Sequence, residues 1–256
     1  MKFYKYQGTG NDFVMIDDRE NTFPANDSEI IAQLCNRRFG IGADGLILLQ
    51  QSKGDFRMLY FNADGSQSTM CGNGGRCFVR FLKDLKLIKN TAKFLAIDGY
   101  HYAEINEALV KLQMQDVHEI TQGDNFYFLN TGSPHHVIFT DHVNDINIKE
   151  QGASVRYSKE YPQGTNVNFV EVLTPNRLYV RTYERGVEDE TYSCGTGVTA
   201  AALAYASSGD HLISNEVHIK TPGGNLLVTF EKNDQGYHSI YLIGPATAVF
   251  KGKIKL

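Results

Sequence analysis

Apolar and polar residues alternate over much of this chain, a pattern typical of β-strands that bury one face. Two glycine-containing turns, at residues 97–100 and 221–224, each predict a hairpin. The chain is therefore expected to be rich in β-sheet. The predicted strands include residues 3–5, 13–16, 102–105, 110–114, 217–220, 226–230 and 240–243.

Helical spacing of apolar residues interrupts this pattern in several places. Asp27 is a suitable N-cap for a helix that carries Ile30, Ile31 and Leu34, and Gly40 is a suitable terminator. A short helix is expected within the loop-rich residues 141–165. Two more helices are predicted after Cys71 and Cys194, each with one buried stripe. The stripes are Phe78, Phe81, Leu82 and Leu85 in the first and Val198, Ala201, Ala202 and Tyr205 in the second.

The segments around these two cysteines repeat one another. Both read Cys-Gly-polar-Gly, at residues 71–74 and 194–197, and both are predicted strand-to-helix turns. Each is followed at a similar distance by one of the hairpin turns. We interpret the chain as a diverged internal duplication. This predicts an α+β fold of two similar, pseudo-symmetric domains, residues 1–117 and 118–244, each a β-sheet wrapped around a central helix.

Length and composition agree with two soluble domains. The chain has 256 residues, 42% of them hydrophobic, which is enough for two ordinary cores. The net charge of −4 and the scattered basic residues argue against a nucleic-acid partner. No apolar run reaches the ~18 residues of a membrane span, and the N-terminus does not resemble a signal peptide. We therefore expect a cytoplasmic protein that does not bind membranes and whose four cysteines are reduced.

A thiol at a helix N-terminus lies where backbone N–H groups and the helix dipole stabilise negative charge. Two such thiols, Cys71 and Cys194, indicate paired acid–base chemistry. Cys35 and Cys77 fall on or within helices and are expected to be core residues. The cysteines and histidines lack compact metal-ligand spacing, and no glycine-rich dinucleotide motif occurs, so neither a metal nor a cofactor is expected.

The sequence resembles the diaminopimelate epimerases over nearly its full length. The two cysteine motifs together are highly specific to that family. The matching segments are residues 8–13, 61–66, 71–77, 132–135, 165–167, 183–186, 194–197, 221–224 and 244–246.

The resemblance implies a two-domain α+β fold with the active site in the interdomain cleft, and residues 245–256 returning to the N-terminal domain. It also implies cofactor-independent epimerisation of LL-2,6-diaminopimelate to the meso form, in the biosynthesis of lysine and peptidoglycan precursors. Inversion of an α-carbon needs one base to remove a proton and an acid to deliver another to the opposite face. The two cysteines would take these roles as thiolate and thiol.

The resemblance also implies roles for further residues. His135 would support Cys71, and Glu184 would support Cys194 and hold the substrate α-ammonium group. Backbone N–H groups at the two helix starts are expected to bind the α-carboxylate. A homodimer is compatible with the sequence. The expected substrate-binding residues are Asn11, Asn62, Gly72, Asn73, Asn166, Glu184, Arg185, Gly195 and Thr196.

Two departures from the family pattern leave alternatives open. Gly45 stands where some members have Gln, and Ser133 where many have Asn. The first alternative is a racemase of another amino acid that needs no pyridoxal phosphate, of the histidine or proline type. Proline-type racemases have histidine at the position of Asn73, which counts against that version. The second is a binding or thiol-redox protein in which the cysteines form a reversible disulfide.

Overall fold

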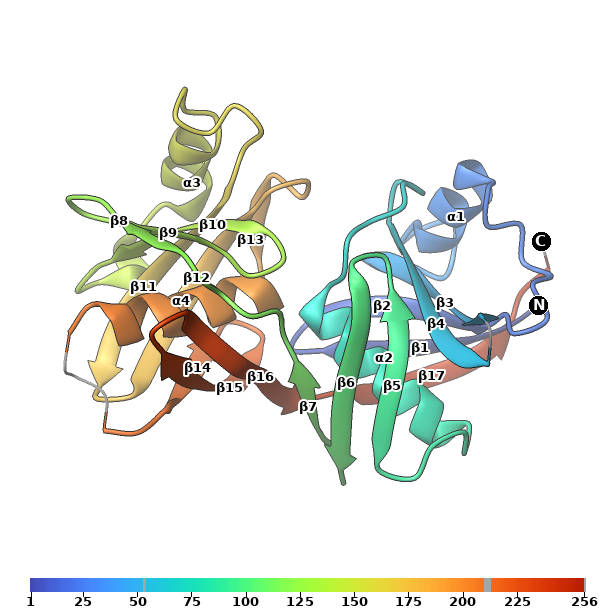
Figure 1. Ribbon diagram of the computed structural model, residues 1–256. Helices are drawn as coiled ribbons and strands as arrows, with labels where there is room; N and C mark the ends of the chain where they lie inside the picture. The colour runs from blue at the N-terminus through green and yellow to red at the C-terminus, as the bar shows by residue number, and fades with distance from the viewer. Residues whose placement is uncertain (53, 210–212, 256) are drawn as a thin grey trace. The chain divides into compact units, whose positions relative to one another are not determined.

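The computed structural model describes residues 1–52, 54–209 and 213–255, and within them the chain forms two compact units (Figure 1). The first unit comprises Met1–Leu112 with Pro245–Leu256, and the second comprises Gln113–Gly244. The first connection lies before Gln113 rather than after residue 117, because Val117 and Tyr237 exchange backbone hydrogen bonds of 2.9 and 2.8 Å within the second unit. No helix among the described residues is long and apolar enough to cross a membrane.

In the first unit, a sheet surrounds helix α2 (Gly72–Asp84). A shorter helix, α1 (Ser28–Cys35), follows the second strand. The strands are β1 (Lys2–Gly8), β2 (Asn11–Asp17), β3 (Gly45–Ser52), β4 (Asp55–Asn62), β5 (Thr91–Ala96), β6 (Gly99–Asn106), β7 (Leu109–Gln113) and β17 (Thr247–Lys253).

In the second unit, a sheet surrounds helix α4 (Gly195–Ser207) in the same way. A 3-10 helix, η1 (Val143–Asp145), and helix α3 (Ile148–Arg156) lie in the predicted loop-rich section. The strands are β8 (Ile120–Gln122), β9 (Tyr127–Asn130), β10 (Pro134–Phe139), β11 (Asn166–Thr174), β12 (Arg177–Glu184), β13 (Asp189–Thr191), β14 (Glu216–Thr221), β15 (Gly224–Asn233) and β16 (Gly236–Pro245).

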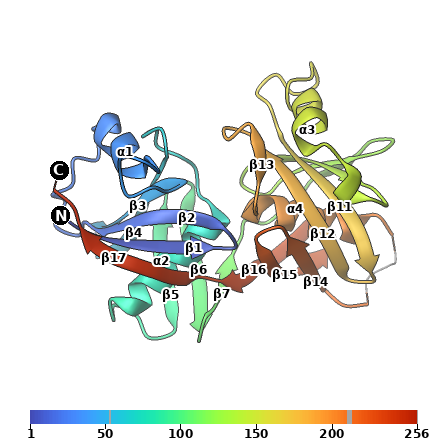
Figure 2. The same cartoon turned by 180° about the vertical axis from the view of Figure 1, so that it is seen from behind.

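The two units share one topology, which confirms the prediction of two similar halves. Pairing follows the order β17-β1-β2-β3-β4-β5-β6-β7 in the first unit and β8-β9-β10-β11-β12-β14-β15-β16 in the second. Both series have parallel pairs at the same two places, and a helix makes each parallel crossover. The last strand, β17, lies along β1 (Figure 2) and takes the position that β8 has in the second unit.

Two details of the helices differ from the sequence prediction. Helix α1 begins after Asp27 as expected, but it ends at Cys35 rather than near Gly40. The Asn36 side chain accepts hydrogen bonds from the backbone N–H groups of Arg38 and Phe39, at 2.9 Å each. These bonds favour a turn over a continued helix. Helix α4 buries every residue from Gly195 to Tyr205 rather than one stripe. Its alanines let the strands approach on all sides.

Candidate active site

Cys71 is the N-cap of α2, in the first unit. Its backbone is extended, with φ −114° and ψ 124°, and its carbonyl oxygen accepts the N–H of Gly75 at 2.7 Å. The side chain is half-buried, and its sulfur lies 3.6 Å from Oδ1 of Asn11. The thiol thus lies at the positive end of the helix dipole, as the sequence predicted.

Asn11 and Asn73 form a network beside Cys71. The Asn11 amide donates to Oδ2 of Asp44 at 2.7 Å, which turns its Oδ1 toward Cys71. The Asn73 amide donates to the same Oδ1 at 3.3 Å. The structure therefore brings together Cys71, Asn11 and Asn73. Asn62, at the end of β4, donates to the Ser66 hydroxyl at 3.3 Å.

Arg76 is an important residue of this network that sequence reasoning missed. Its guanidinium is fully buried and donates to Oδ1 of Asn73 at 3.0 Å, to Oγ1 of Thr9 at 3.2 Å and to the carbonyl of Gly72 at 3.3 Å. It makes no ion pair with a carboxylate of the described residues. Burial lowers the pKa of Arg76 to about 10. One signal existed in the repeat: the corresponding residue of the second motif is the uncharged Thr199.

Cys194 is the N-cap of α4, in the second unit, with nearly the same backbone conformation as Cys71, φ −112° and ψ 114°. Its carbonyl oxygen accepts the N–H of Val198 at 2.9 Å. The side chain is buried, and its sulfur lies 3.4 Å from the hydroxyl of Thr196. Both predicted helix-start thiols are therefore present.

His135 lies on β10 and is completely buried. One ring nitrogen, Nε2, lies 2.9 Å from Oγ1 of Thr196, and the other, Nδ1, lies 3.0 Å from Nδ2 of Asn168. The resemblance associated His135 with Cys71. In the structure both ring nitrogens bond residues of the second unit, because β10 and β11 bring the ring against the start of α4. Support of Cys71 by His135 stays a prediction.

A second group of expected residues gathers where β11 begins and β12 ends. Asn166 accepts the backbone N–H of Arg185 at 2.9 Å and donates to the hydroxyl of Ser133 at 2.9 Å. The Arg185 guanidinium donates to the carbonyl of Gln163 at 3.1 Å. Glu184 is the last residue of β12 and is half-buried. The two positions that depart from the family pattern lie in different places. Ser133 belongs to this group through its bond to Asn166, whereas Gly45 lies on β3 in the first unit.

The remaining cysteines belong to the core, as predicted. Cys35 and Cys77 are buried, and burial raises the pKa of each thiol to about 12. At neutral pH both are protonated and therefore poor nucleophiles and bases. Among the described residues no cluster of histidine, cysteine or acidic side chains has the geometry to hold a metal ion.

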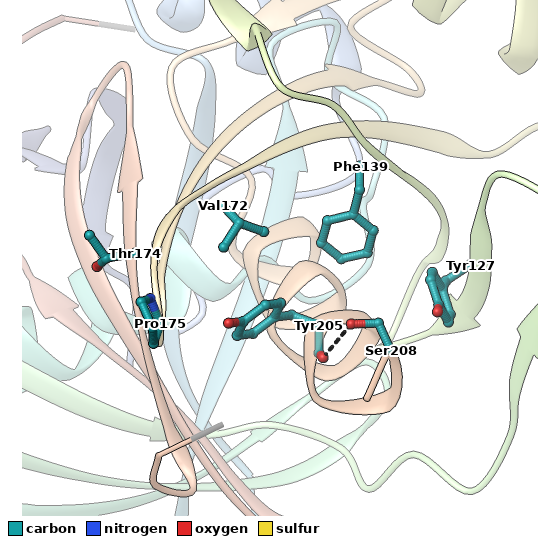
Figure 3. A pocket seen from close by; sticks show the side chains of 7 residues that line it. All are labelled: Tyr127, Phe139, Val172, Thr174, Pro175, Tyr205 and Ser208. Carbon is teal, nitrogen blue, oxygen red and sulfur yellow. Dashed lines mark hydrogen bonds between the residues drawn. The ribbon is translucent and has the colours of Figure 1, made fainter. Parts of the chain in front are cut away.

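The second unit also contains a cavity of about 550 Å³, but it lies at the C-terminal end of α4 (Figure 3). Tyr205, which lines it, comes 11 residues after Cys194 (205 − 194), about 16 Å along the helix. Its walls are mainly aromatic and aliphatic, so it offers no acid–base pair. The lining residues are Tyr127, Phe139, Val172, Thr174, Pro175, Tyr205 and Ser208.

The third residues after the two cysteines, Gly74 and Gly197, should respond differently to alanine. A Cβ on Gly197 would lie 2.4 Å from Oδ1 of Asn168 and 3.3 Å from Cε1 of His135, both held by hydrogen bonds. A Cβ on Gly74 would meet only side-chain ends, at 3.1 Å or more. We expect Gly197→Ala to lower kcat about 10-fold or more by displacing the Cys194 turn. Gly74→Ala, the matched control, should stay close to wild type; equal losses in both variants would contradict this.

Two buried histidines should make stability depend on pH. Burial lowers the pKa of His135 to about 3 and that of His136 to about 4, from an ordinary value of 6.5. Below pH 6.5 these histidines bind protons in the unfolded chain but not in the folded protein. Their contribution to the free energy of unfolding is therefore fully present above pH 6.5 and is lost as the pH falls toward the folded pKa values. We expect a loss of up to ~1.4 kcal/mol per pH unit per histidine. Urea unfolding at several pH values should show this slope, and His136→Gln should reduce it.

Both the sequence and the fold are similar to those of known proteins. The family model for diaminopimelate epimerase matches residues 3–117 and 127–249. A diaminopimelate epimerase of Flavobacterium psychrophilum is 54% identical over 99% of this chain and 100% of its own. One from Chlorobaculum tepidum is 44% identical over 97% and 99%. The crystal structure of a phenazine biosynthesis protein of the PhzF family from Bacillus anthracis has the same fold, with a TM-score of 0.80 and 14% identity over 100% of this chain and 99% of that one.

Proposed function

The chain belongs to the diaminopimelate epimerase family, and from this we infer that it is an isomerase that converts LL-2,6-diaminopimelate to the meso epimer. We propose that it does so without a cofactor, in the synthesis of lysine and peptidoglycan precursors. One observation carries the mechanism: two cysteines cap the central helices of two units that share one topology.

In the proposed mechanism Cys71 and Cys194 act on the same α-carbon. One thiolate removes the α-proton, and the other thiol delivers a proton to the opposite face. Two negatively charged sulfurs beside one substrate carbon repel each other, which favours a pair that holds a single proton. Exchange of the protonation states lets the same pair catalyse the reverse reaction.

The helix starts are proposed to bind the α-carboxylate. The first backbone N–H groups of an α-helix point out of its N-terminus, and in α2 and α4 these belong to Gly72 and Asn73 and to Gly195 and Thr196. Together with the helix dipoles they would stabilise the negative charge that develops when the α-proton leaves. Glu184 is proposed to hold the α-ammonium group.

The distal end of the substrate is assigned to Arg185, Asn166 and Asn62. Arg185 and Asn166 are joined by a hydrogen bond, and the Ser133 hydroxyl extends this group where many relatives have Asn. At Gly45 a Cβ would lie 2.5 Å from the carbonyl oxygen of Phe61, so packing alone accounts for glycine there. Neither departure argues against diaminopimelate as the substrate.

We also propose that the enzyme works in the cytoplasm, where its reactive thiols stay reduced. A homodimer is a further proposal. Val249 and Phe250 support it, since both are more than half exposed on β17 and could be covered by a second copy. Sedimentation of the purified protein tests the dimer.

One experiment tests the activity. The reduced protein is incubated in deuterated water, without pyridoxal phosphate, with LL- or meso-diaminopimelate, histidine or proline, and α-deuteration is followed by NMR. Exchange of both diaminopimelate isomers is expected. Exchange of histidine or proline alone would show a racemase of another amino acid. No exchange with any of them would favour a binding or redox protein.

A further inference from the structure

A chain of hydrogen bonds in the second unit leads from Asn168 to the sulfur of Cys194. Asn168 contacts His135 at 3.0 Å, His135 contacts the hydroxyl of Thr196 at 2.9 Å, and that hydroxyl lies 3.4 Å from the sulfur. All four side chains are buried. Each link joins a donor to an acceptor, so the direction of the first bond determines the directions of the others.

The orientation of the Asn168 amide is determined by its neighbours. Its Nδ2 lies 3.3 Å from the carbonyl oxygen of His136, which can only accept a hydrogen bond. Its Oδ1 accepts the hydroxyl of Thr182 at 3.0 Å. The amide nitrogen is therefore the atom that faces His135, and it donates to Nδ1.

This donation determines the tautomer of His135. Because Nδ1 accepts, the ring proton must be on Nε2, which donates to Thr196. Burial, together with the charge of Arg185, lowers the pKa of His135 to about 3, so the ring is neutral at physiological pH. A neutral ring with its proton directed at Thr196 is not a base for the substrate.

The last link is the hydroxyl of Thr196. Its oxygen accepts the Nε2 proton, so its own hydrogen is available to the sulfur of Cys194. We propose that Asn168 is a positioning residue that, through His135, makes Thr196 a hydrogen-bond donor to Cys194 and so favours the thiolate form of this cysteine. This inference rests on the proposed function, in which Cys194 acts as a base.

The first unit treats its cysteine differently. At the position of Thr196 it has Asn73, which donates to Asn11. The atom of Asn11 that faces Cys71 is an amide oxygen, an acceptor. By this inference the hydroxyl beside Cys194 is a donor, whereas the amide oxygen beside Cys71 is an acceptor.

The tautomer can be measured on the wild-type protein without substrate. Nitrogen-15 NMR of the histidine rings distinguishes Nε2–H, Nδ1–H and doubly protonated forms, and loss of a signal in His135→Gln identifies His135. We expect the Nε2–H tautomer, unchanged through the neutral range. An Nδ1–H ring, or protonation near neutral pH, would overturn the proposal. Because no substrate is present, failure of diaminopimelate exchange would reject the proposed function without affecting this result.

Variants test whether the chain reaches the sulfur. Alkylation of Cys194 by iodoacetamide, followed by peptide mass spectrometry across pH, gives the midpoint at which the thiolate forms. Thr196→Val should raise this midpoint by about one pH unit, the effect of one hydrogen bond to a charge, and Thr196→Ser should preserve it. Asn168→Leu should raise it similarly although Asn168 does not touch the sulfur, and the double variant should add little.

The matched control is His136→Gln on the same strand. The ring of His136 bonds the hydroxyl of Tyr161 and stacks on Phe126, whereas only its backbone carbonyl meets Asn168. Its replacement should leave the Cys194 midpoint unchanged. An unchanged midpoint in folded Asn168→Leu, or an equal rise in His136→Gln, would overturn the proposal. If Asn168→Leu does not fold, the proposal is still tested by the tautomer of wild-type His135 and by the midpoints of Thr196→Val and Thr196→Ser.

Discussion

Alanine at either Cys71 or Cys194 should abolish epimerisation, with kcat at least about 10³-fold below wild type. Each substitution removes one of the two groups that transfer a proton, and a single positioned acid or base typically contributes 10²–10⁴-fold. The expected losses are alike, because inversion needs both faces of the α-carbon. Cys35→Ala is the matched control: its thiol is buried and protonated, so turnover should be largely retained.

Isotope exchange makes this prediction sharper. In deuterated water the wild-type enzyme should form meso product that carries deuterium at the inverted carbon, since the proton is delivered by the second thiol. Neither alanine variant should form inverted product from either isomer. Both alanine variants should still bind the substrate, because the helix-start N–H groups remain, and calorimetry measures this binding. Normal inversion by Cys71→Ala or Cys194→Ala would reject the two-thiol mechanism.

The elements that sequence alone could predict have local causes. Asp27 caps α1 by accepting the N–H groups of Glu29 and Ile30, at 3.1 Å each, and this depends on adjacent residues. The two cysteine motifs predict the starts of α2 and α4 in the same way. A strand comes shortly before the second motif, but residues 63–70 separate β4 from the first. Because the motif occurs twice, the duplication could also be predicted, and the matching strand topology of the two units bears it out.

What the sequence could not supply depends on contacts between distant segments. The partners of His135 come from β11 and α4, and no spacing rule connects residues 33 and 61 positions apart. The burial of α4 on all sides depends on how the strands of its sheet close around it. In the sequence Arg76 looks like an ordinary arginine on a helix, and only the fold shows that it is fully buried. Tertiary packing decides each of these features.

Arg76→Met should separate activity from stability. The buried guanidinium orients Asn73, which in turn holds Asn11 beside Cys71. Its positive charge also lies on the helix whose N-terminus is proposed to bind the carboxylate, where it favours both that group and a Cys71 thiolate. Loss of this charge and orientation should lower kcat/KM about 100-fold.

Stability should change much less, because two effects of the substitution oppose each other. Removing a buried cation that pairs with no carboxylate among the described residues relieves a desolvation penalty. The lost hydrogen bonds to the oxygens of Asn73 and Thr9 cost about 1–3 kcal/mol in total, because the Thr9 hydroxyl still donates to Asn73 at 3.4 Å. We therefore expect a free energy of unfolding within about 2 kcal/mol of wild type.

Arg80→Met is the control on the same helix. Arg80 pairs with Asp84 at 3.0 Å near the surface, where such a pair contributes little, so both activity and stability should stay near wild type. Urea unfolding and diaminopimelate exchange, measured on the same preparations, test both variants. Full activity in Arg76→Met would show that its charge is dispensable. If activity falls only as far as the protein unfolds, Arg76 serves the fold. If the charge serves catalysis, its removal should lower activity far more than stability.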